Sequence, residues 1–286
     1  MPTIYITTSG FKNLTAIQTV KLYLKNDITG IELSGGKYTS ENQIDKISRI
    51  KKTKLISIHN YFPPEKDPFI LNLASFDKKI LSRSIKKIKQ NINYSKKINC
   101  KFYSFHAGFR IDPMIKDLGK KFTKNLLSTK DDAINNFLEQ VKKINKYAKK
   151  IGIKLLIENN VFSNENYKVF NDNPFLLTNA QDINGFFSCM DKNVRLLMDT
   201  GHLKVSAKTE KKNLIKSLKS CGKYIGGYQL SDNDGLTDSN KLFSNKSWFV
   251  PYLKKNLDYY SIEVYDKNLM KLKSQISILK KIIYEK

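Results

Sequence analysis

A single alternating pattern runs through this chain from one end to the other and limits the folds open to it. Short apolar runs rich in β-branched residues are each followed by a longer stretch whose apolar residues have helical spacing. Eight such runs occur, at residues 3–8, 30–35, 54–60, 102–108, 154–160, 194–201, 226–232 and 259–265. Near-continuous apolar strands that alternate with helices form a parallel sheet covered on both faces. Eight repeats favour a closed barrel over an open sheet, so we predict an α/β fold, a (β/α)8 TIM barrel.

Residues 131–149 illustrate the helical stretches between these runs. One face of the predicted helix is apolar, at Ile134, Phe137, Leu138, Val141, Ile144 and Ala148. Gly152 is expected to end this helix before the fifth strand. No composition break, linker or low-complexity tract divides the 286 residues, and a barrel of this kind needs roughly 250. We therefore predict one TIM-barrel domain, residues 1–286.

Two connections are long enough to affect a site at the barrel rim. Residues 60–76 contain the pair Pro63-Pro64, which stiffens the turn, and three apolar residues, Phe62, Phe69 and Ile70. This segment either covers a cleft or packs over the rim, and the sequence favours neither. Residues 232–249 run from the seventh strand toward the eighth, and we expect them to form a flexible lid.

The formal charge of +25 raises the question of a nucleic-acid partner. Lysines are spread over almost every helical stretch and only four residues are arginine, so the pattern favours solvated helix faces over a polyanion-binding face. Nucleic acid is therefore not expected as a partner, although long-range attraction of an anionic substrate stays open. The first residues lack a basic segment followed by an apolar core, and no run of about 18 apolar residues occurs. We expect a soluble, cytoplasmic protein with no membrane partner.

Three cysteines, Cys100, Cys189 and Cys221, lie far apart in the sequence and form no CxxC pair. This spacing suggests neither a zinc knot nor a disulfide framework. We expect reduced, ordinary thiols.

Polar residues that follow the apolar runs should gather at one rim, because the carboxyl ends of parallel barrel strands share one end of the barrel. In chain order they are His59, His106, Glu158, Asp199, His202, Gln229, Asp232 and Glu263. All three histidines of the chain belong to this set. A lone histidine after a strand is more often structural, but three of three at strand ends favour a functional site.

The two glutamates of this set follow directly on apolar residues, in LLIE and YSIE, where an unpaired charge is costly. The alternative is a structural salt bridge, but no basic residue recurs at the other strand ends. Glu158, Glu263, Asp199 and a neutral oxygen donor fit a divalent cation such as Mn²⁺ or Mg²⁺, with Co²⁺ or Zn²⁺ also open.

An ordered set of motifs carries a family resemblance from Thr3 to about Tyr265. The motifs are GIELSGG, FHAG, LLIENN, LMDTGH, YQLSDNDG and SIEVY. Together they resemble the xylose-isomerase-like TIM-barrel superfamily of sugar phosphate isomerases and epimerases. The resemblance implies a metal site made of a Glu, an Asp, a His or similar donor, and a Glu after strands five to eight. By position these are Glu158, Asp199, Gln229 and Glu263.

The strand-seven motif departs from the family pattern. Many members have His in HLxDxDG, whereas this chain has Gln229 in YQLSDNDG. Hydroxypyruvate-isomerase-like members resemble this chain in using an amide there, which implies Mg²⁺ or Mn²⁺ rather than zinc. Asp232 and Asp234 are interpreted as turn or outer residues rather than ligands, since DNDG is also a good turn sequence.

The resemblance implies proton transfer next to a carbonyl that the metal polarises, so that an enediolate forms. Glu158 and Glu263 are the implied catalytic pair, one removing and the other returning a proton. The predicted substrate-binding residues are His59, His106, His202, Asn160, Asp232 and Lys204; for Lys204, a solvated or packed lysine is the alternative to an anion contact. The implied partner is a small carbohydrate, and many relatives are homo-oligomers. Isomerisation, epimerisation and dehydration stay open.

Two other functions are compatible with the sequence. An apurinic-site endonuclease, zinc-dependent and endonuclease IV-like, would also use His59, His106, Glu158, Asp199 and His202. It further needs a His after strand seven and Asp-x-His in the next loop, where this chain has Gln229 and no histidine. The other is a non-catalytic sugar-binding barrel, against which retention of both glutamates argues.

Overall fold

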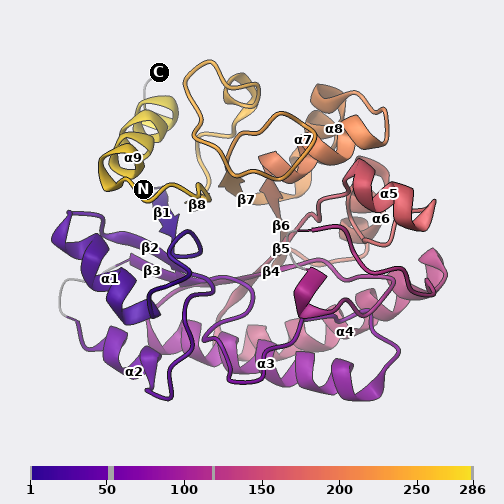
Figure 1. The fold of residues 1–286 in the computed structure, drawn as a ribbon, viewed down its shortest axis with the longest axis horizontal. Coiled ribbons are helices and arrows are strands. Elements are labelled where there is room, and N and C mark those ends of the chain that lie inside the picture. Colours follow the sequence, from indigo (N-terminus) through magenta and orange to yellow (C-terminus); the bar gives the residue numbers. More distant parts are fainter. Residues whose placement is uncertain (1, 51–54, 118–119, 285–286) are drawn as a thin grey trace.

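The computed structural model describes residues 2–50, 55–117 and 120–284. Its strands form one sheet in the order β3-β2-β1-β8-β7-β6-β5-β4, and every ladder between neighbours is parallel. The strands are β1 (Thr3–Thr7), β2 (Gly30–Leu33), β3 (Leu55–Ile58), β4 (Phe102–His106), β5 (Lys154–Glu158), β6 (Val194–Asp199), β7 (Ile225–Leu230) and β8 (Tyr259–Ile262). Helices surround these strands (Figure 1). The predicted (β/α)8 barrel is confirmed; Lys54, the first residue of the third predicted run, lies outside the described residues.

The barrel closes between β3 and β4 through an isolated contact rather than a full ladder. His59 and Ser104 form a parallel bridge, and the backbone N–H of Asn60 donates to the carbonyl of Ser104 at 2.7 Å. The seam therefore lies at His59, one of the residues predicted for the site.

The helices are α1 (Ala16–Lys25), α2 (Gln43–Ser48), α3 (Lys78–Lys97), α4 (Lys130–Ile151), α5 (Asn164–Phe170), α6 (Ala180–Ser188), α7 (Thr200–Thr209), α8 (Leu214–Cys221) and α9 (Leu269–Tyr284). Short 3-10 turns occur at η1 (Ile115–Asp117), η2 (Gly222–Tyr224) and η3 (Val250–Tyr252). None of the described helices combines the length and apolar character needed to cross a membrane.

Helix α4 has the face that its sequence predicts. Phe137, Val141, Ile144 and Ala148 are buried, while Ile134 and Leu138 are partly buried against the same core. Gly152 ends the helix with φ of 81°, a left-handed conformation that glycine adopts without steric cost.

The interior of the barrel is layered along its axis. At the amino-terminal ends of the strands, the apolar side chains of Tyr5, Phe102, Leu156, Leu197 and Tyr259 pack together. This plug makes the barrel a filled core rather than a pore, so polar inward-facing residues collect toward the carboxyl ends.

The connection at residues 60–76 is packed rather than free. Phe62 is fully buried, and the ammonium of Lys87 on α3 donates to the carbonyl of Pro63 at 2.8 Å and to Glu65 at 3.0 Å. Arg83 binds the same carboxylate at 2.8 Å. These contacts support the packed interpretation of this loop.

The connection at residues 232–249 replaces the helix that the alternating pattern would put between β7 and β8, and η3 follows it. Asp232 and Lys241 pair through two backbone hydrogen bonds of 3.0 and 2.8 Å, and Phe243 and Phe249 are buried. The loop is thus anchored on the barrel; its motion as a lid stays a prediction.

Candidate active site

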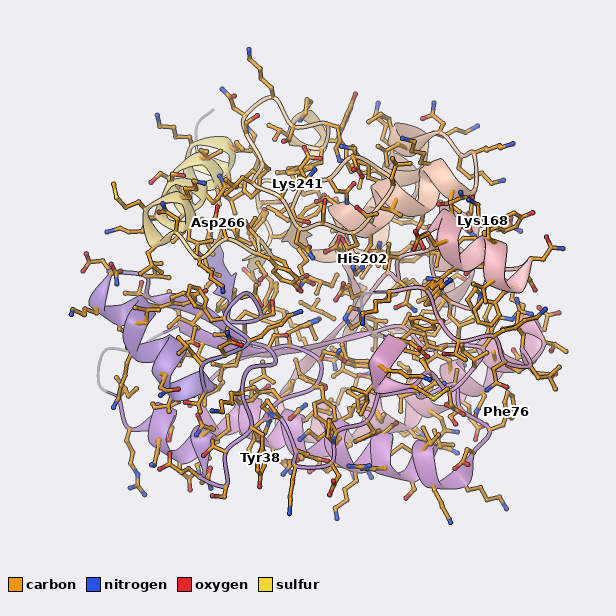
Figure 2. All side chains as sticks on the ribbon, in the orientation of Figure 1. Tyr38, Phe76, Lys168, His202, Lys241 and Asp266 are labelled. Carbon is orange, nitrogen blue, oxygen red and sulfur yellow. The ribbon has the colours of Figure 1, made fainter. Side chains whose placement is uncertain are left out.

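Side chains from the carboxyl ends of β3, β4, β5, β6 and β8 meet inside the rim of the barrel. His59 and Glu263 each follow a strand directly, and His106, Glu158 and Asp199 are the last residues of theirs. Strand register sets neighbours side by side, since His106 pairs with Glu158. His202, in the first turn of α7, lies near the middle of the molecule in Figure 2, among the strand ends.

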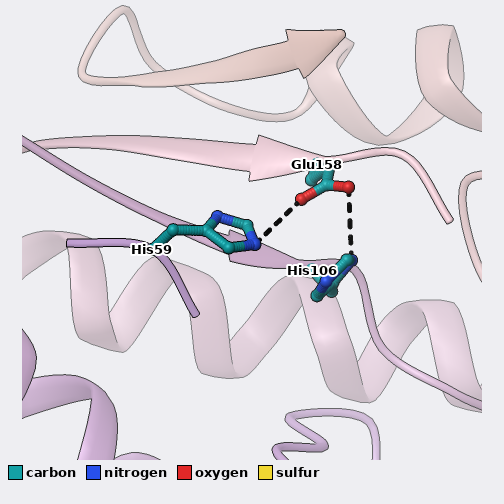
Figure 3. A group of neighbouring side chains, drawn as sticks. All are labelled: His59, His106 and Glu158. Atoms are coloured by element: carbon teal, nitrogen blue, oxygen red, sulfur yellow. Dashed lines mark ion pairs between the residues drawn. The ribbon is translucent and has the colours of Figure 1, made fainter. Parts of the chain in front are cut away.

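Glu158 lies at the centre of the three histidines. Its Oε2 is 3.3 Å from Nε2 of His59, and its Oε1 is 3.5 Å from Nδ1 of His106, as Figure 3 shows, and 3.0 Å from Nδ1 of His202. The carboxyl group is fully buried, and within the described part of the chain neither oxygen has a hydrogen bond of good geometry.

Burial raises the pKa of Glu158 to about 8. Burial also lowers the pKa of His59 to about 3, and burial together with the two neighbouring histidines lowers the pKa of His106 well below its usual value. His59 and His106 are therefore neutral imidazoles, the form in which histidine binds metals.

His202 differs because its two ring nitrogens meet acceptors on both sides. Nδ1 lies 2.8 Å from the carbonyl oxygen of Asn159, and Nε2 lies 3.2 Å from Oδ2 of Asp238. Burial alone would lower the pKa of His202, but the charges of Asp199 and Asp238 and the hydrogen bonds raise it well above its usual value. A ring that donates from both nitrogens is an imidazolium, so His202 brings positive charge to a carboxylate-rich site.

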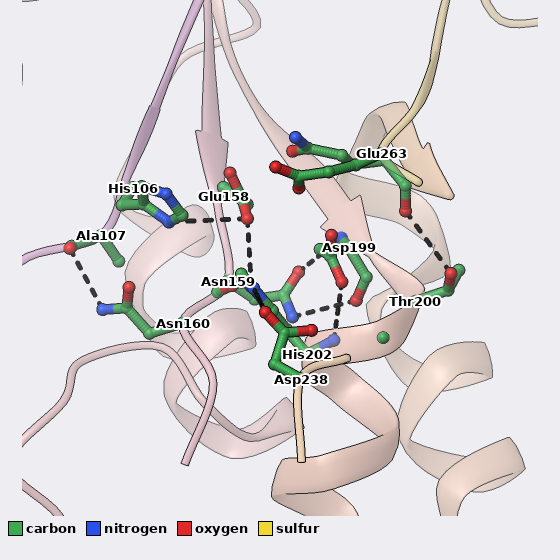
Figure 4. Close-up of polar contacts among 12 residues, drawn as sticks. His106, Ala107, Glu158, Asn159, Asn160, Asp199, Thr200, His202, Asp238 and Glu263 are labelled. Carbon is green, nitrogen blue, oxygen red and sulfur yellow. Dashed lines mark hydrogen bonds and ion pairs between the residues drawn. The ribbon is translucent and has the colours of Figure 1, made fainter. Parts of the chain in front are cut away.

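The DTGH segment places Asp199 and His202 together for a local reason. Asp199 is the N-cap of α7, and its Oδ1 accepts the backbone N–H of His202 at 2.6 Å. Gly201 lies so close to the β7 exit that a Cβ would be 2.7 Å from Oγ of Ser231. The amide of Asn159 holds the backbone of Asp199 through two hydrogen bonds, shown in Figure 4.

Several buried polar atoms of the site have no hydrogen-bond partner within the described residues, which tests whether a cation fits. They are Oδ2 of Asp199, both side-chain polar atoms of Gln229, and both oxygens of Glu158. Asp199 and Gln229 are paired in register on β6 and β7. Leaving such atoms unsatisfied is costly, and carboxylate and amide oxygens are the donors that hard divalent cations prefer. The residues present fit a divalent cation.

Two groups of described histidines and carboxylates bring their donor atoms within 4.8 Å of one another. One is His59, His106 and Glu158; the other is Glu158, Asp199 and His202. Glu158 is common to both groups, and Glu263 belongs to neither. The four-ligand set implied by the family resemblance stays a prediction.

Glu263 follows β8 directly, and its carboxyl group points toward the strand-end residues around Glu158 in Figure 4. Burial raises its pKa well above the usual value, and repulsion from the charge of Glu158 adds to this. Its Oε1 receives hydrogen bonds from the hydroxyl of Tyr265 at 3.0 Å and from that of Ser9 at 3.5 Å.

Three residues predicted to bind substrate are engaged elsewhere in the protein. The side-chain nitrogen of Asn160 donates to the carbonyls of Ala107, Gly108 and Leu176. Only the side-chain oxygen of Asn160 would then contact a substrate. Lys204 forms an ion pair with Asp232 at 2.7 Å, and Asp232 also accepts from Ser247 at 2.8 Å. These contacts brace loops, and the predicted substrate contacts stay predictions.

Sequence reasoning missed three residues of this region. Asp238 is in a loop whose path carries no strand or helix periodicity, and Tyr265 is the last residue of the eighth predicted run, two residues after Glu263. Glu32 is a fully buried carboxyl group on β2 that accepts a hydrogen bond from Tyr259. The motif GIEL could have drawn attention to Glu32, because a carboxylate inside an apolar run needs a partner.

Comparison with known families agrees with this geometry. The family described as xylose isomerase-like TIM barrel matches residues 20–286. The chain belongs to this family. The xylose isomerase-like barrel predicted from the sequence motifs is thus confirmed, whereas none of the curated proteins compared with the chain matches it.

Solved structures share this xylose isomerase-like fold at low sequence identity. A D-tagatose 3-epimerase-like protein is 16% identical with a TM-score of 0.73, over 99% of this chain and 97% of that one. D-psicose 3-epimerase from Clostridium cellulolyticum, solved with D-tagatose, is 15% identical with a TM-score of 0.67, over 98% and 99%. A Thermus thermophilus protein, from a crystal soaked with ZnCl₂, is 15% identical with a TM-score of 0.64, over 98% of each chain.

Proposed function

We propose that this protein is a metal-dependent isomerase or epimerase of a small ketose or related sugar. The observation that carries the proposal is the set of buried donor atoms without a hydrogen-bond partner among the described residues on Glu158, Asp199 and Gln229, with the carboxyl group of Glu263 pointing toward them. The sugar 3-epimerases among the structural neighbours support the choice of substrate class. The same chemistry would also act on a phosphorylated sugar or a keto acid.

The protein's residues divide the proposed work between them. Glu158 and Glu263 are the two groups that exchange a proton with a carbon next to the carbonyl. One carboxylate takes the proton and becomes a carboxylic acid; the other returns a proton to the same carbon from its opposite face, or to the neighbouring carbon. No atom is gained or lost overall. The His202 imidazolium, whose ring nitrogens meet Asn159 and Asp238, would contribute positive charge to the site.

A divalent cation would be held by Glu158, Asp199, Gln229 and Glu263, with Mn²⁺ or Mg²⁺ favoured by the oxygen donors. When bound, it would supply the positive charge that polarises the carbonyl and favours ionised carboxylates. His59 and His106, whose ring nitrogens lie 3.3 and 3.5 Å from the Glu158 oxygens, would orient this carboxyl group.

The test is solvent deuterium incorporation into free and phosphorylated ketoses with Mn²⁺ present. We expect exchange at a single carbon, and its position identifies the reaction. Glu158→Gln and Glu263→Gln should each abolish exchange, whereas Glu139→Gln, on the exposed face of α4, should leave it unchanged. Metal binding and exchange that both survive the two site changes would contradict the proposal, whereas a wild type that exchanges no proton of any ketose would favour a sugar-binding barrel without catalysis.

A zinc-dependent apurinic-site endonuclease remains the second candidate, because His59, His106 and Glu158 form a group that could hold another cation. Gln229 in place of histidine argues against it. Metal content separates the two candidates: close to three zinc ions per chain would favour the nuclease, and one divalent cation the isomerase.

A further inference from the structure

Tyr265 contacts one particular oxygen of Glu263. Its hydroxyl donates to Oε1 at 3.0 Å, and Oγ of Ser9 approaches the same atom at 3.5 Å. Ser9 is itself held by a 3.0 Å hydrogen bond with Oγ1 of Thr7. Among the described residues, the two donors to the Glu263 carboxyl group therefore reach one oxygen, although a carboxylate has acceptor positions on two.

We propose that Tyr265 is a positioning residue that reserves Oε1 of Glu263 for the protein and leaves Oε2 for the reaction. The inference rests on the proposed function, in which Glu263 works as a proton-transfer group and cation ligand. A carboxylate held at one oxygen cannot rotate freely, so its second oxygen keeps a fixed direction toward the bound substrate. It also disfavours coordination of a cation through both oxygens.

A backbone hydrogen bond holds Tyr265 in place. The N–H of Tyr265 donates to the carbonyl of Asn240 at 3.0 Å, and the side chain of Asn240 accepts from Ser231 at 3.2 Å. Asn240 is buried in the loop that follows β7. Tyr265 is thus tied to the barrel rim through a segment independent of its own strand.

The same short segment also reaches the other catalytic glutamate. Asp238, two residues before Asn240, pairs with His202, and His202 contacts Glu158. His202 therefore lies between Asp238 and Glu158, and Tyr265 lies between Asn240 and Glu263. This arrangement fixes the two carboxyl groups relative to one another, which proton transfer at a single carbon requires.

A purely packing role for Tyr265 makes a different prediction, because the ring rather than the hydroxyl would matter. Tyr265→Phe separates the two roles, since it keeps the ring and removes the hydroxyl. Tyr38→Phe is the matched control: Tyr38 is also partly exposed, at 43% against 44% for Tyr265, and lies at the edge of the molecule in Figure 2.

The experiment measures proton-exchange kinetics and the visible absorption spectrum of the Co²⁺-loaded protein. For Tyr265→Phe we expect kcat to fall about 10- to 100-fold with KM nearly unchanged, the size expected for loss of a hydrogen bond to a charged group. We also expect an altered Co²⁺ spectrum as Glu263 gains freedom to coordinate through both oxygens. Tyr38→Phe should match the wild type in both measurements.

Wild-type kcat together with a wild-type Co²⁺ spectrum in Tyr265→Phe would overturn the inference. If the wild type binds Co²⁺ but exchanges no sugar proton, the proposed function fails while the spectrum still decides the role of Tyr265. Should Tyr265→Phe not fold, Ser9→Ala removes the other donor to the same oxygen. A smaller spectral change in the same direction then supports the inference, and an unchanged spectrum overturns it.

Discussion

Nε2 of His202 lies 3.2 Å from Oδ2 of Asp238, so a loop residue supports a charged ring at the base of the site. The ring is nearly buried, whereas the carboxylate of Asp238 is 24% exposed. The pair connects the loop after β7 to the first turn of α7. Together with the charge of Asp199, it explains why the pKa of His202 is raised although burial alone would lower it.

Asp238→Asn removes the charge from this pair while keeping its shape. We expect the free energy of unfolding to fall by about 1 kcal/mol at pH 6, a value discounted for the exposure of Asp238. A histidine whose folded-state pKa is raised contributes stability below its unfolded pKa and loses it as pH rises through the folded value. The loss in Asp238→Asn should therefore be smaller at pH 9 than at pH 6. Urea unfolding at both pH values measures this, with Asp131→Asn on α4 as an exposed control; equal losses would contradict the raised pKa.

Cation binding should become tighter with rising pH. Burial raises the pKa of Asp199 to about 6 and that of Glu158 to about 8, so protons must leave before a cation takes their place. The increase in thermal unfolding midpoint caused by Mn²⁺ should be larger at pH 8 than at pH 6. Differential scanning fluorimetry with and without EDTA checks this. A midpoint shift independent of pH would show that the cation binds elsewhere.

Gln229→Leu should affect the metal-free and metal-loaded protein in opposite directions. The change removes two buried polar atoms without partners among the described residues, so the metal-free protein should gain about 1–2 kcal/mol of unfolding free energy. The stabilisation by Mn²⁺ should fall, because an oxygen ligand is lost. Calorimetric titration and urea unfolding measure the two effects; loss of metal-free stability would instead indicate that Gln229 has structural partners.

Glu32→Gln should stabilise the metal-free protein increasingly as pH rises. Glu32 is fully buried, and burial raises its pKa to about 7, with the charge of Asp199 adding to the effect. The folded state thus holds a proton that the unfolded chain releases near pH 4.5, so wild-type stability is lost as pH rises between these values. Relative to wild type, the variant should gain about 2–3 kcal/mol between pH 5 and pH 8.5.

Urea unfolding in EDTA measures this gain, and Glu139→Gln on the exposed face of α4 serves as the control. A difference between Glu32→Gln and wild type that stays constant with pH would mean that Glu32 keeps an ordinary pKa.

Sequence periodicity was a sound guide to the barrel because each strand and helix has to bury its own apolar residues. The prediction for α4 succeeded for this reason: Phe137 and Val141 have to face a core whatever surrounds them. Between β7 and β8 the sequence indicated a long loop, but the spacing of its residues did not indicate that Phe243 and Phe249 would anchor it. Loop residues bury themselves by contacts that no regular spacing encodes.

The same distinction holds for the site. The sequence by itself determined that His59, His106, Glu158, Asp199 and Glu263 come to one rim, because parallel strands end together. Only the tertiary structure decided the charge states of these residues and the contacts that hold them. Burial, Asp238 and Tyr265 set these properties through contacts between residues far apart in the chain. It placed His202 between Glu158 and Asp238, and Tyr265 against one oxygen of Glu263.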